Sequence, residues 1–175
     1  VNVQNCLGPV ALEGLSVSTG SHRLVVQQCA SVSARGCLYH SAAFTFGSDV
    51  TLTDCTFAPS SFPGVITQQG GRVQLTNTHL ASIATSGPAG PCVTMTGGDL
   101  RVLGTSVLDT ASFGANPGPA VAGSGTLRID PSVTVNAGAT PFAAGIAVTT
   151  PAMPHVTATL APLGGTLTAA LHGPL

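Results

Sequence analysis

The chain has 175 residues, of which 43% are hydrophobic, 6% charged and 4% aromatic, and its formal net charge at neutral pH is −1. An average soluble domain has about 25% charged residues, so this composition provides no basic surface for nucleic acid or for an anionic membrane. The length suffices for one domain with a sizeable core, and the hydrophobic content excludes a disordered chain.

Short strand-like segments follow one another along the chain and share one pattern. Apolar and polar residues alternate, and each segment ends on a polar or small residue followed by Cys, Thr or Ser. In chain order the segments are VNVQNC (1–6), LVVQQC (24–29), VTLTDC (50–55), VQLTNT (73–78), LRVLGT (100–105) and LRIDPS (127–132). They recur with a period of roughly 23–27 residues, whereas helical periodicity is absent. The chain is therefore predicted to be a repeat protein.

A second strand precedes most copies across a glycine turn, as in PCVTMTGGDLRV (91–102). Each unit then contains two strands, a polar corner, a short third strand and a loop. Stacked units of this kind predict an all-β fold, a parallel β-helix (β-solenoid) of about six coils over residues 1–150. A β-sandwich is the alternative, but a sandwich has no reason to reuse one segment in every period.

The pattern V-x-L-x-[ND]-[CT], found at residues 50–55 and 73–78, resembles right-handed parallel β-helix proteins of the pectin-lyase-like superfold. The resemblance extends over about residues 1–150 and implies a right-handed β-helix whose strands meet at a tight corner, often occupied by Asn. That superfold includes lyases, hydrolases, phage tailspikes and adhesins, so the resemblance implies a fold and not one activity.

In such a fold, equivalent residues of neighbouring coils lie about 4.8 Å apart and form ladders. The predicted corner ladder consists of Asn5, Gln28, Asp54, Asn77, Gly104 and Pro131. Asn, Asp and Gly accept the left-handed backbone conformation of a sharp corner, so Gln28 and Pro131 predict corners of a different shape.

The residues after the corner form a second ladder that contains Cys6, Cys29 and Cys55 and continues into Thr78. A metal site or a stack of disulfides is one interpretation. We favour buried thiols that act as small hydrophobic side chains, because a line of sulfurs does not surround a metal tetrahedrally and a ladder step exceeds the Cβ separation of a disulfide.

A third ladder, on the outward face, is predicted to contain Arg23, Asp49, Arg72 and Asp99, with the sign of the charge alternating from coil to coil. Alternation of this kind predicts a row of surface ion pairs. The adjacent ladder ends in Arg101 and Arg128, which could bind an anionic sugar or remain solvated.

No catalytic, cofactor-binding or metal-binding residues are predicted. The acidic residues are Glu13, Asp49, Asp54, Asp99, Asp109 and Asp130, and their repeat positions form neither the carboxylate pair of a glycoside hydrolase nor the carboxylate cluster of a calcium-dependent lyase. The chain is therefore predicted not to be an enzyme. A polysaccharide lyase or glycoside hydrolase is the alternative, and an ice-binding face made of Thr-x-Thr pairs is a third possibility.

Residues 151–175 contain no charged side chain but include two strand-like runs, at 155–163 and 165–175, which are predicted to cap the coils or contact another subunit. Prolines interrupt this tail, so no membrane span is predicted. The chain starts at Val1, which suggests a processed or excised piece. Low charge and open strand edges predict a secreted or cell-surface module that is structural, self-assembling (fibre-like) or adhesive. Its expected partners are its own copies and a surface polysaccharide.

Overall fold

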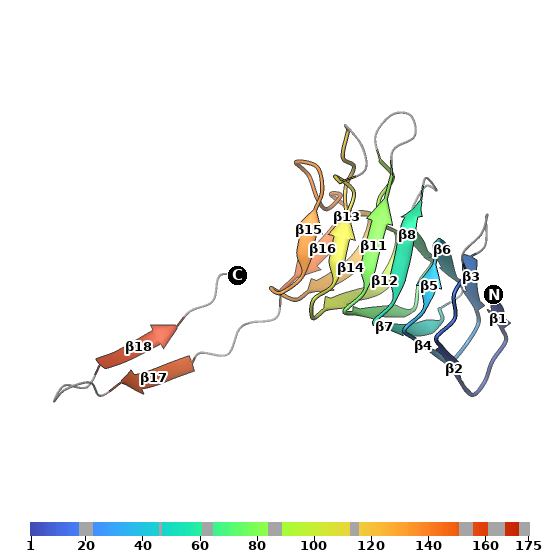
Figure 1. Ribbon diagram of the computed structural model, residues 1–175, viewed down its shortest axis with the longest axis horizontal. Helices are drawn as coiled ribbons and strands as arrows, with labels where there is room; N and C mark the ends of the chain where they lie inside the picture. Colours follow the sequence, from blue (N-terminus) through green and yellow to red (C-terminus); the bar gives the residue numbers. More distant parts are fainter. Residues whose placement is uncertain are drawn as a thin grey trace.

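The computed structural model describes residues 1–17, 23–45, 47–60, 65–83, 89–112 and 116–150, together with two strands in the tail. Every regular element in these residues is a β-strand, which confirms the all-β prediction (Figure 1). Within the same residues, no helix has the length and hydropathy needed to cross a membrane.

Most strands belong to one 11-stranded sheet, which is strongly curled and in which all pairs are parallel. The sheet has two arms. The first arm contains β1 (Asn2–Gln4), β3 (Arg23–Gln27), β6 (Ser41–Thr45), β9 (Ile66–Gln68) and the first halves of β12 (Val93–Leu103) and β14 (Val121–Ile129). The second arm contains β2 (Pro9–Glu13), β4 (Ser31–Arg35), β7 (Asp49–Thr53), β10 (Arg72–Thr76), the second halves of β12 and β14, and β16 (Ile146–Thr149).

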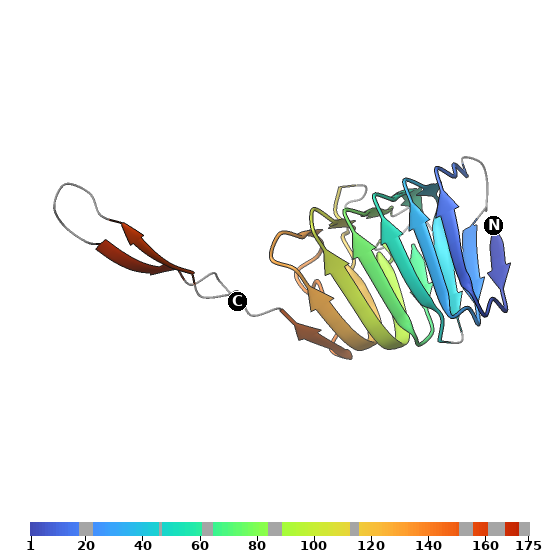
Figure 2. The same ribbon diagram turned by 90° about the horizontal axis from the view of Figure 1, so that it is seen from below.

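A separate 5-stranded parallel sheet forms the third wall (Figures 1 and 2). Its strands are β5 (Leu38–Tyr39), β8 (Thr56–Ser60), β11 (His79–Ser82), β13 (Val107–Asp109) and β15 (Thr134–Asn136). The chain runs repeatedly from the first arm to the second arm and then to this sheet, and each new strand lies beside its counterpart from the preceding passage. This arrangement is compatible with a β-solenoid.

The core lies between the three walls and follows the alternation in the sequence. In β7 the side chains of Val50 and Leu52 are buried, while Thr51 and Thr53 are half-buried on the outer face. Tyr39 and Phe57 on the third wall are both fully buried, with ring centroids 5.6 Å apart. Burial of each large apolar side chain stabilises the fold by about 1.5–3 kcal/mol, so the buried rows hold the strand register.

Glycines allow the bend between the two arms. Gly71 and Gly98 both have positive φ, and a Cβ at either position would collide with the backbone of the preceding passage of the chain. Only glycine permits both the left-handed conformation and this close approach. The chain therefore turns here without losing contact between neighbouring passages.

The polar corner predicted as one ladder is in fact two corners. Asn5 and Gln28 lie at the corner between the first and second arms. The corner between the second arm and the third wall contains Asp54, Asn77 and Gly104. All five residues have positive φ. The predicted left-handed conformation is therefore confirmed for Asn5, Asp54, Asn77 and Gly104. The prediction of a different corner shape at Gln28 is wrong, because its φ of 52° is also left-handed.

The tail contains β17 (Val156–Leu160) and β18 (Leu167–Leu171), which pair with each other in antiparallel register as a separate 2-stranded sheet. Both strands fall within the two runs that the sequence predicted. Capping or subunit contact by these strands stays a prediction.

Candidate functional site

Charged residues gather on the outer face of the second arm. Strand register places Arg72 of β10 between Asp49 of β7 and Asp99 of β12. The backbone N–H of Arg72 donates to Asp49 Oδ1 (3.2 Å), and Arg72 Nε lies 3.5 Å from Asp99 Oδ2. Arg101, two residues further along β12, approaches the same oxygen at 3.2 Å. Asp99 is thus the centre of a small ionic network.

Arg23 does not belong to this row, and the prediction that placed it there is wrong. Arg23 begins β3 in the first arm and lies beside Ser41 of β6. The strand next to β7 on this face is β4, whose Val32 pairs with Val50, the residue after Asp49. The prediction failed because the segments at both corners have the same local pattern. The segment VSARGC (32–37) is the true counterpart of VTLTDC. Its glycine at the corner position, Gly36, was the signal in the sequence that the repeat alignment missed.

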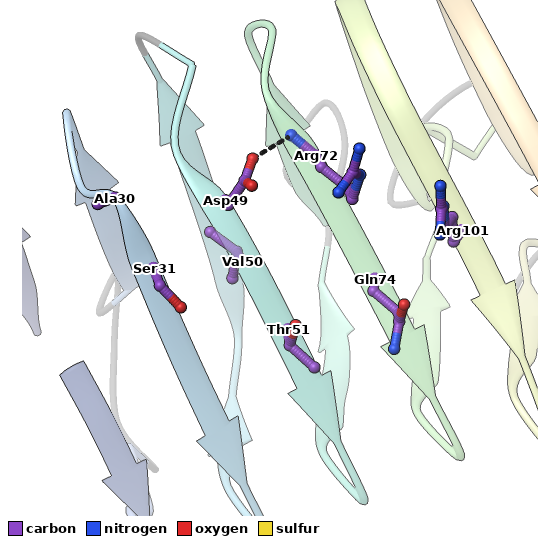
Figure 3. A pocket seen from close by; sticks show the side chains of 8 residues that line it. All are labelled: Ala30, Ser31, Asp49, Val50, Thr51, Arg72, Gln74 and Arg101. Atoms are coloured by element: carbon purple, nitrogen blue, oxygen red, sulfur yellow. Dashed lines mark hydrogen bonds between the residues drawn. The ribbon is translucent and has the colours of Figure 1, made fainter. Parts of the chain in front are cut away.

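A shallow hollow of about 240 Å³ lies on this face (Figure 3). Its lining residues come from β4, β7, β10 and β12 and from the residue before β4: Ala30, Ser31, Asp49, Val50, Thr51, Arg72, Gln74 and Arg101. Arg128 on β14 is the next neighbour of Arg101. The hollow therefore offers the Asp49 carboxylate beside guanidinium, amide and hydroxyl groups along a row of strands.

The two carboxylates of this face are poorly placed for hydrolysis. Strand register places Arg72 between Asp49 and Asp99, so a guanidinium group lies between the two carboxylates, where a glycoside hydrolase needs the sugar bond. Asp99 also contacts two guanidinium groups through one oxygen, which makes it an ion-pair partner in this arrangement.

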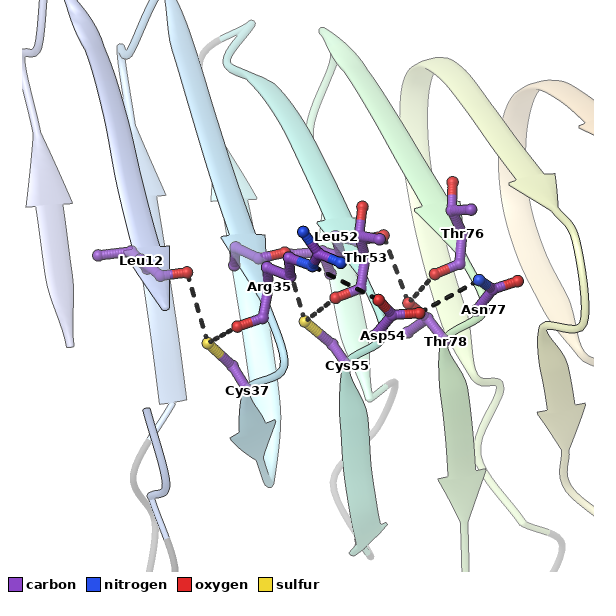
Figure 4. A network of polar contacts seen from close by, with 11 residues as sticks. Leu12, Arg35, Cys37, Leu52, Thr53, Asp54, Cys55, Thr76, Asn77 and Thr78 are labelled. Carbon is purple, nitrogen blue, oxygen red and sulfur yellow. Dashed lines mark hydrogen bonds and ion pairs between the residues drawn. The ribbon is translucent and has the colours of Figure 1, made fainter. Parts of the chain in front are cut away.

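A polar network follows the second corner (Figure 4). Arg35 Nε lies 3.6 Å from Asp54 Oδ2, and Asn77 Nδ2 donates to Asp54 Oδ1 at 3.1 Å. Asn77 Oδ1 in turn accepts from the backbone N–H and the hydroxyl of Thr105, at 3.1 and 3.2 Å. Each residue bridges to the next passage of the chain, so the network's role is to hold neighbouring corners in register. Sequence reasoning identified Asp54 and Asn77 but missed Arg35.

The predicted thiol ladder is also divided between the two corners. Cys6 and Cys29 occupy the first corner, whereas Cys37 and Cys55 occupy the second, where Thr78 continues the column. The expectation that Cys55 stacks on Cys29 is therefore wrong, because Cys37 takes that place. The thiols of Cys37 and Cys55 and the hydroxyl of Thr78 each donate a hydrogen bond to the carbonyl two residues earlier and another to a carbonyl of the preceding passage.

All five cysteines are free thiols. Burial is the main cause that raises the pKa of Cys55, and burial raises the pKa of Cys92 to about 12. The neighbouring Cys29 thiol and, secondly, burial raise the pKa of Cys6. Within the described ranges, no group of three or more His, Cys, Asp or Glu side chains could hold a metal ion.

Asp109 has partners that the sequence did not reveal. Its side chain is only 7% exposed, and Oδ1 accepts hydrogen bonds from the backbone N–H groups of Ala111 and Ser112 and from Asn136 Nδ2. Burial acts to raise the pKa of Asp109, but the hydrogen bonds from Ser112 and Ala111 and the nearby His79 outweigh it and lower the pKa. As a buried acceptor, Asp109 therefore holds Ala111 and Ser112 in place directly after β13.

Asp130 also accepts hydrogen bonds locally, from the backbone N–H and hydroxyl of Ser132, which lower its pKa. The Thr-x-Thr pairs do not build a continuous threonine face among the described strands, because Thr51 lies between Ser33 and Gln74 and Thr94 lies beside Ala122. The pairs in the tail have side chains outside the described residues.

Comparison with known proteins found no matching family model, curated protein or solved structure.

Proposed function

We propose that the chain forms a right-handed parallel β-helix (β-solenoid) of about six coils and serves as a structural module that assembles with its own copies or adheres, in a secreted or cell-surface protein. The parallel in-register strands and the three walls support the solenoid. The outer faces support a structural role, because Arg35, Arg72 and Arg101 are engaged in local ion pairs with Asp54 and Asp99.

The observation that carries the assembly proposal is a row of half-buried apolar residues beside β1 and β2, the outermost strands at one end of the described stack. Among the described residues, β1 pairs only with β3, and β2 pairs only with β4. Val10, Leu12 and Leu15 pack against the core but remain partly exposed, whereas equivalent residues of inner strands, such as Val50 and Leu52, are buried. Another strand layer on this edge would bury them and pair the free backbone groups.

A second copy can supply that layer from its opposite end. At that end β16 pairs with β14 alone among the described strands, and Val133, Val135 and Phe142 are again only partly buried. All strands of the three walls are parallel, so one end of a copy matches the other end of the next. Contact between two different surfaces is heterologous and extends into a filament.

The test uses a proline that blocks the open edge without breaking the fold. Gly14 N donates to Arg35 O, and N–H direction alternates along a strand, so the Ala11 N–H points away from β4. Ala11→Pro therefore removes no bond to β4, but it removes a donor from the edge and places the ring there. Ala11→Ser, which keeps the N–H, is the matched control.

Molar mass is measured by light scattering after size-exclusion chromatography over a concentration series, with negative-stain microscopy of the same samples. We expect the mass of the wild type and of Ala11→Ser to rise with concentration, and Ala11→Pro to remain monomeric with an unchanged circular dichroism spectrum. A wild type that stays monomeric at the highest concentration, or a proline variant that assembles equally well, would contradict the proposal.

Binding or cleavage of an acidic polysaccharide is the second candidate, and the hollow that contains Arg72, Gln74 and Arg101 favours it. Incubation with a panel of acidic polysaccharides distinguishes the two. Turnover by the wild type that disappears in Asp99→Asn or Arg101→Gln would replace the structural role with an enzymatic one. Absence of turnover across the panel supports the structural role.

A further inference from the structure

The hollow on the outer face of the second arm has an acidic end and a basic end (Figure 3). Asp49 on β7 forms the acidic end, where it is exposed and has no ion pair among the described residues. Arg72 on β10 and Arg101 on β12 form the basic end, and Asp99 pairs with both. Two positive charges and one negative charge give the basic end a net charge of +1, whereas the acidic end has a net charge of −1. Arg128, the next neighbour of Arg101, lies outside the lining and adds positive charge on the basic side.

Asp99 orients both guanidinium groups before a ligand binds. Arg72 Nε lies 3.5 Å and Arg101 Nε lies 3.2 Å from the same oxygen, Asp99 Oδ2. Among the described residues, no hydrogen bond uses a terminal guanidinium nitrogen (Nη) of either arginine. The Nη groups belong to the planar donor fork that carboxylates bind. The basic end therefore presents pre-oriented donors to an anionic group of a ligand, which lowers the entropy cost of binding.

The Asp49 carboxylate is separate from these two guanidinium groups. Its Oδ1 accepts the backbone N–H of Arg72 at 3.2 Å, whereas the Arg72 side chain pairs with Asp99 of the strand on the other side of β10. In the strand register, Asp49 lies one strand from Arg72 and two strands from Arg101. The carboxylate is thus available to a cationic group of the same ligand, and its charge repels a second anionic group there.

The space between the two ends is polar. Ser31, Thr51 and Gln74 line it, and their side chains form no hydrogen bond with other described residues, so they are available to the hydroxyl groups of a sugar. β2 and β14 continue the arm on both sides of the hollow, so neighbouring strands already use the backbone groups and a peptide strand cannot pair here. The face therefore suits a sugar chain better than a peptide, and the hollow does not depend on either end of the stack.

We propose that the hollow binds a zwitterionic polysaccharide in which an amino sugar with an ammonium group alternates with a uronic acid. The ammonium group contacts Asp49, the carboxylate contacts Arg72 and Arg101, and ring hydroxyls contact the polar side chains between them. A polymer with a carboxylate on every ring brings one of them to Asp49, and a polymer with an ammonium group on every ring brings one of them to the arginines. Alternation avoids both repulsions.

This inference rests on the adhesive part of the proposed function, for which it names the chemistry of the partner. It requires neither assembly of copies nor cleavage of the polymer. A wild type that stays monomeric would therefore contradict the assembly proposal without affecting this one. Absence of binding in the assay below would contradict this inference and leave the assembly proposal standing.

The test measures binding of four probes to the folded wild type by isothermal titration calorimetry at low salt, where screening is weak. The zwitterionic probe is an N-deacetylated hyaluronan oligosaccharide, in which glucosamine alternates with glucuronic acid. Intact hyaluronan of the same length has only carboxylates, a chitosan oligosaccharide has only ammonium groups, and an alternating Lys-Glu peptide has both charges without a sugar. We expect the zwitterionic oligosaccharide to bind about fivefold more tightly than each of the others, since an exposed charge contact contributes at most about that factor.

Variants assign the two ends. Asp49→Asn keeps the oxygen that accepts the Arg72 N–H, so the fold is retained, and it should weaken the zwitterionic probe about threefold to fivefold without weakening hyaluronan. Arg101→Gln should weaken both probes. Glu13→Gln and Arg23→Gln, which remove the same two kinds of charge outside the lining, are the matched controls and should leave both affinities unchanged.

Four results would overturn the proposal. Hyaluronan that binds as tightly as the zwitterionic probe would make the hollow a site for acidic polysaccharides in general. Chitosan or the Lys-Glu peptide that binds as tightly would remove the need for both charges or for a sugar. Affinity for the zwitterionic probe that is unchanged in Asp49→Asn, or absent in the wild type, would exclude the hollow as its site.

Discussion

Replacing Asp54 tests whether a left-handed corner, and not an acidic function, explains this residue. Asp54 has φ 53°, accepts a hydrogen bond from Asn77 Nδ2 and lies 3.6 Å from Arg35 Nε. Three substitutions separate these contributions. Asp54→Asn keeps the acceptor oxygen and a residue type that accepts positive φ. Asp54→Gly keeps only the acceptance of positive φ, and Asp54→Ala keeps neither property.

The expected losses of stability follow from these differences. A non-glycine residue without a polar side chain costs about 1–2 kcal/mol in the left-handed region. The hydrogen bond contributes about 0.5–1.5 kcal/mol, and the ion pair, whose side chains are 73% and 45% exposed, contributes at most about 1 kcal/mol. We therefore expect Asp54→Ala to lower the free energy of unfolding by about 2–4 kcal/mol, Asp54→Gly by about 1 kcal/mol less than that, and Asp54→Asn by less than about 1 kcal/mol.

Equilibrium urea denaturation followed by circular dichroism measures the three variants beside the wild type. The order Ala, Gly, Asn from largest to smallest loss is the result that the corner geometry requires. If glycine destabilises as much as alanine or more, the left-handed conformation is not what selects Asp54 and the reasoning fails.

Three further predictions concern other sites. The pKa of Asp109 is lowered in the folded chain, so its carboxylate stabilises the fold above the unfolded pKa, and this stability is lost as pH falls through the folded pKa. In acid titrations followed by circular dichroism, we expect the stability of the wild type to drop below about pH 4. The stability of Asp109→Asn should drop less over the same range. Asp99→Asn should lower the free energy of unfolding by no more than about 1 kcal/mol per ion pair, a difference that shrinks in about 1 M salt; an unchanged difference there would contradict an exposed ion-pair role. Cys55→Thr should destabilise the fold only slightly, because Thr78 occupies the next place in the column with equivalent hydrogen bonds. Cys55→Leu should destabilise it by about 1–3 kcal/mol, because the larger side chain overpacks the corner. Thermal melts compare the two variants.

Local features of the chain were predictable from the sequence. Alternation at residues 50–53 identified Val50 and Leu52 as buried, since strand side chains point to opposite faces. Polar corner residues such as Asn77 were recognisable because few residue types accept positive φ. Repetition of these segments indicated that parallel strands pair with their counterparts.

The partners of each strand were less accessible. Two corners in each passage of the chain need the same chemistry, a residue that accepts positive φ followed by a small inward side chain, so LVVQQC and VTLTDC look alike although they belong to different walls. Arg23 was therefore assigned to the wrong row, and Cys37 was not recognised as the neighbour of Cys55. Similarly, the contact between Asp109 and Asn136 joins residues 27 positions apart and has no local signature.

The sequence by itself determined the strand class, the inward-facing residues and the corner conformations at Asn5, Asp54, Asn77 and Gly104, because these depend on side-chain alternation and on backbone sterics within a few residues. Only the tertiary structure decided which strands are neighbours, and hence which charges, thiols and carboxylates meet. Segments with the same local pattern belong to different walls, and the packing of the buried rows between neighbouring passages sets which of them pair.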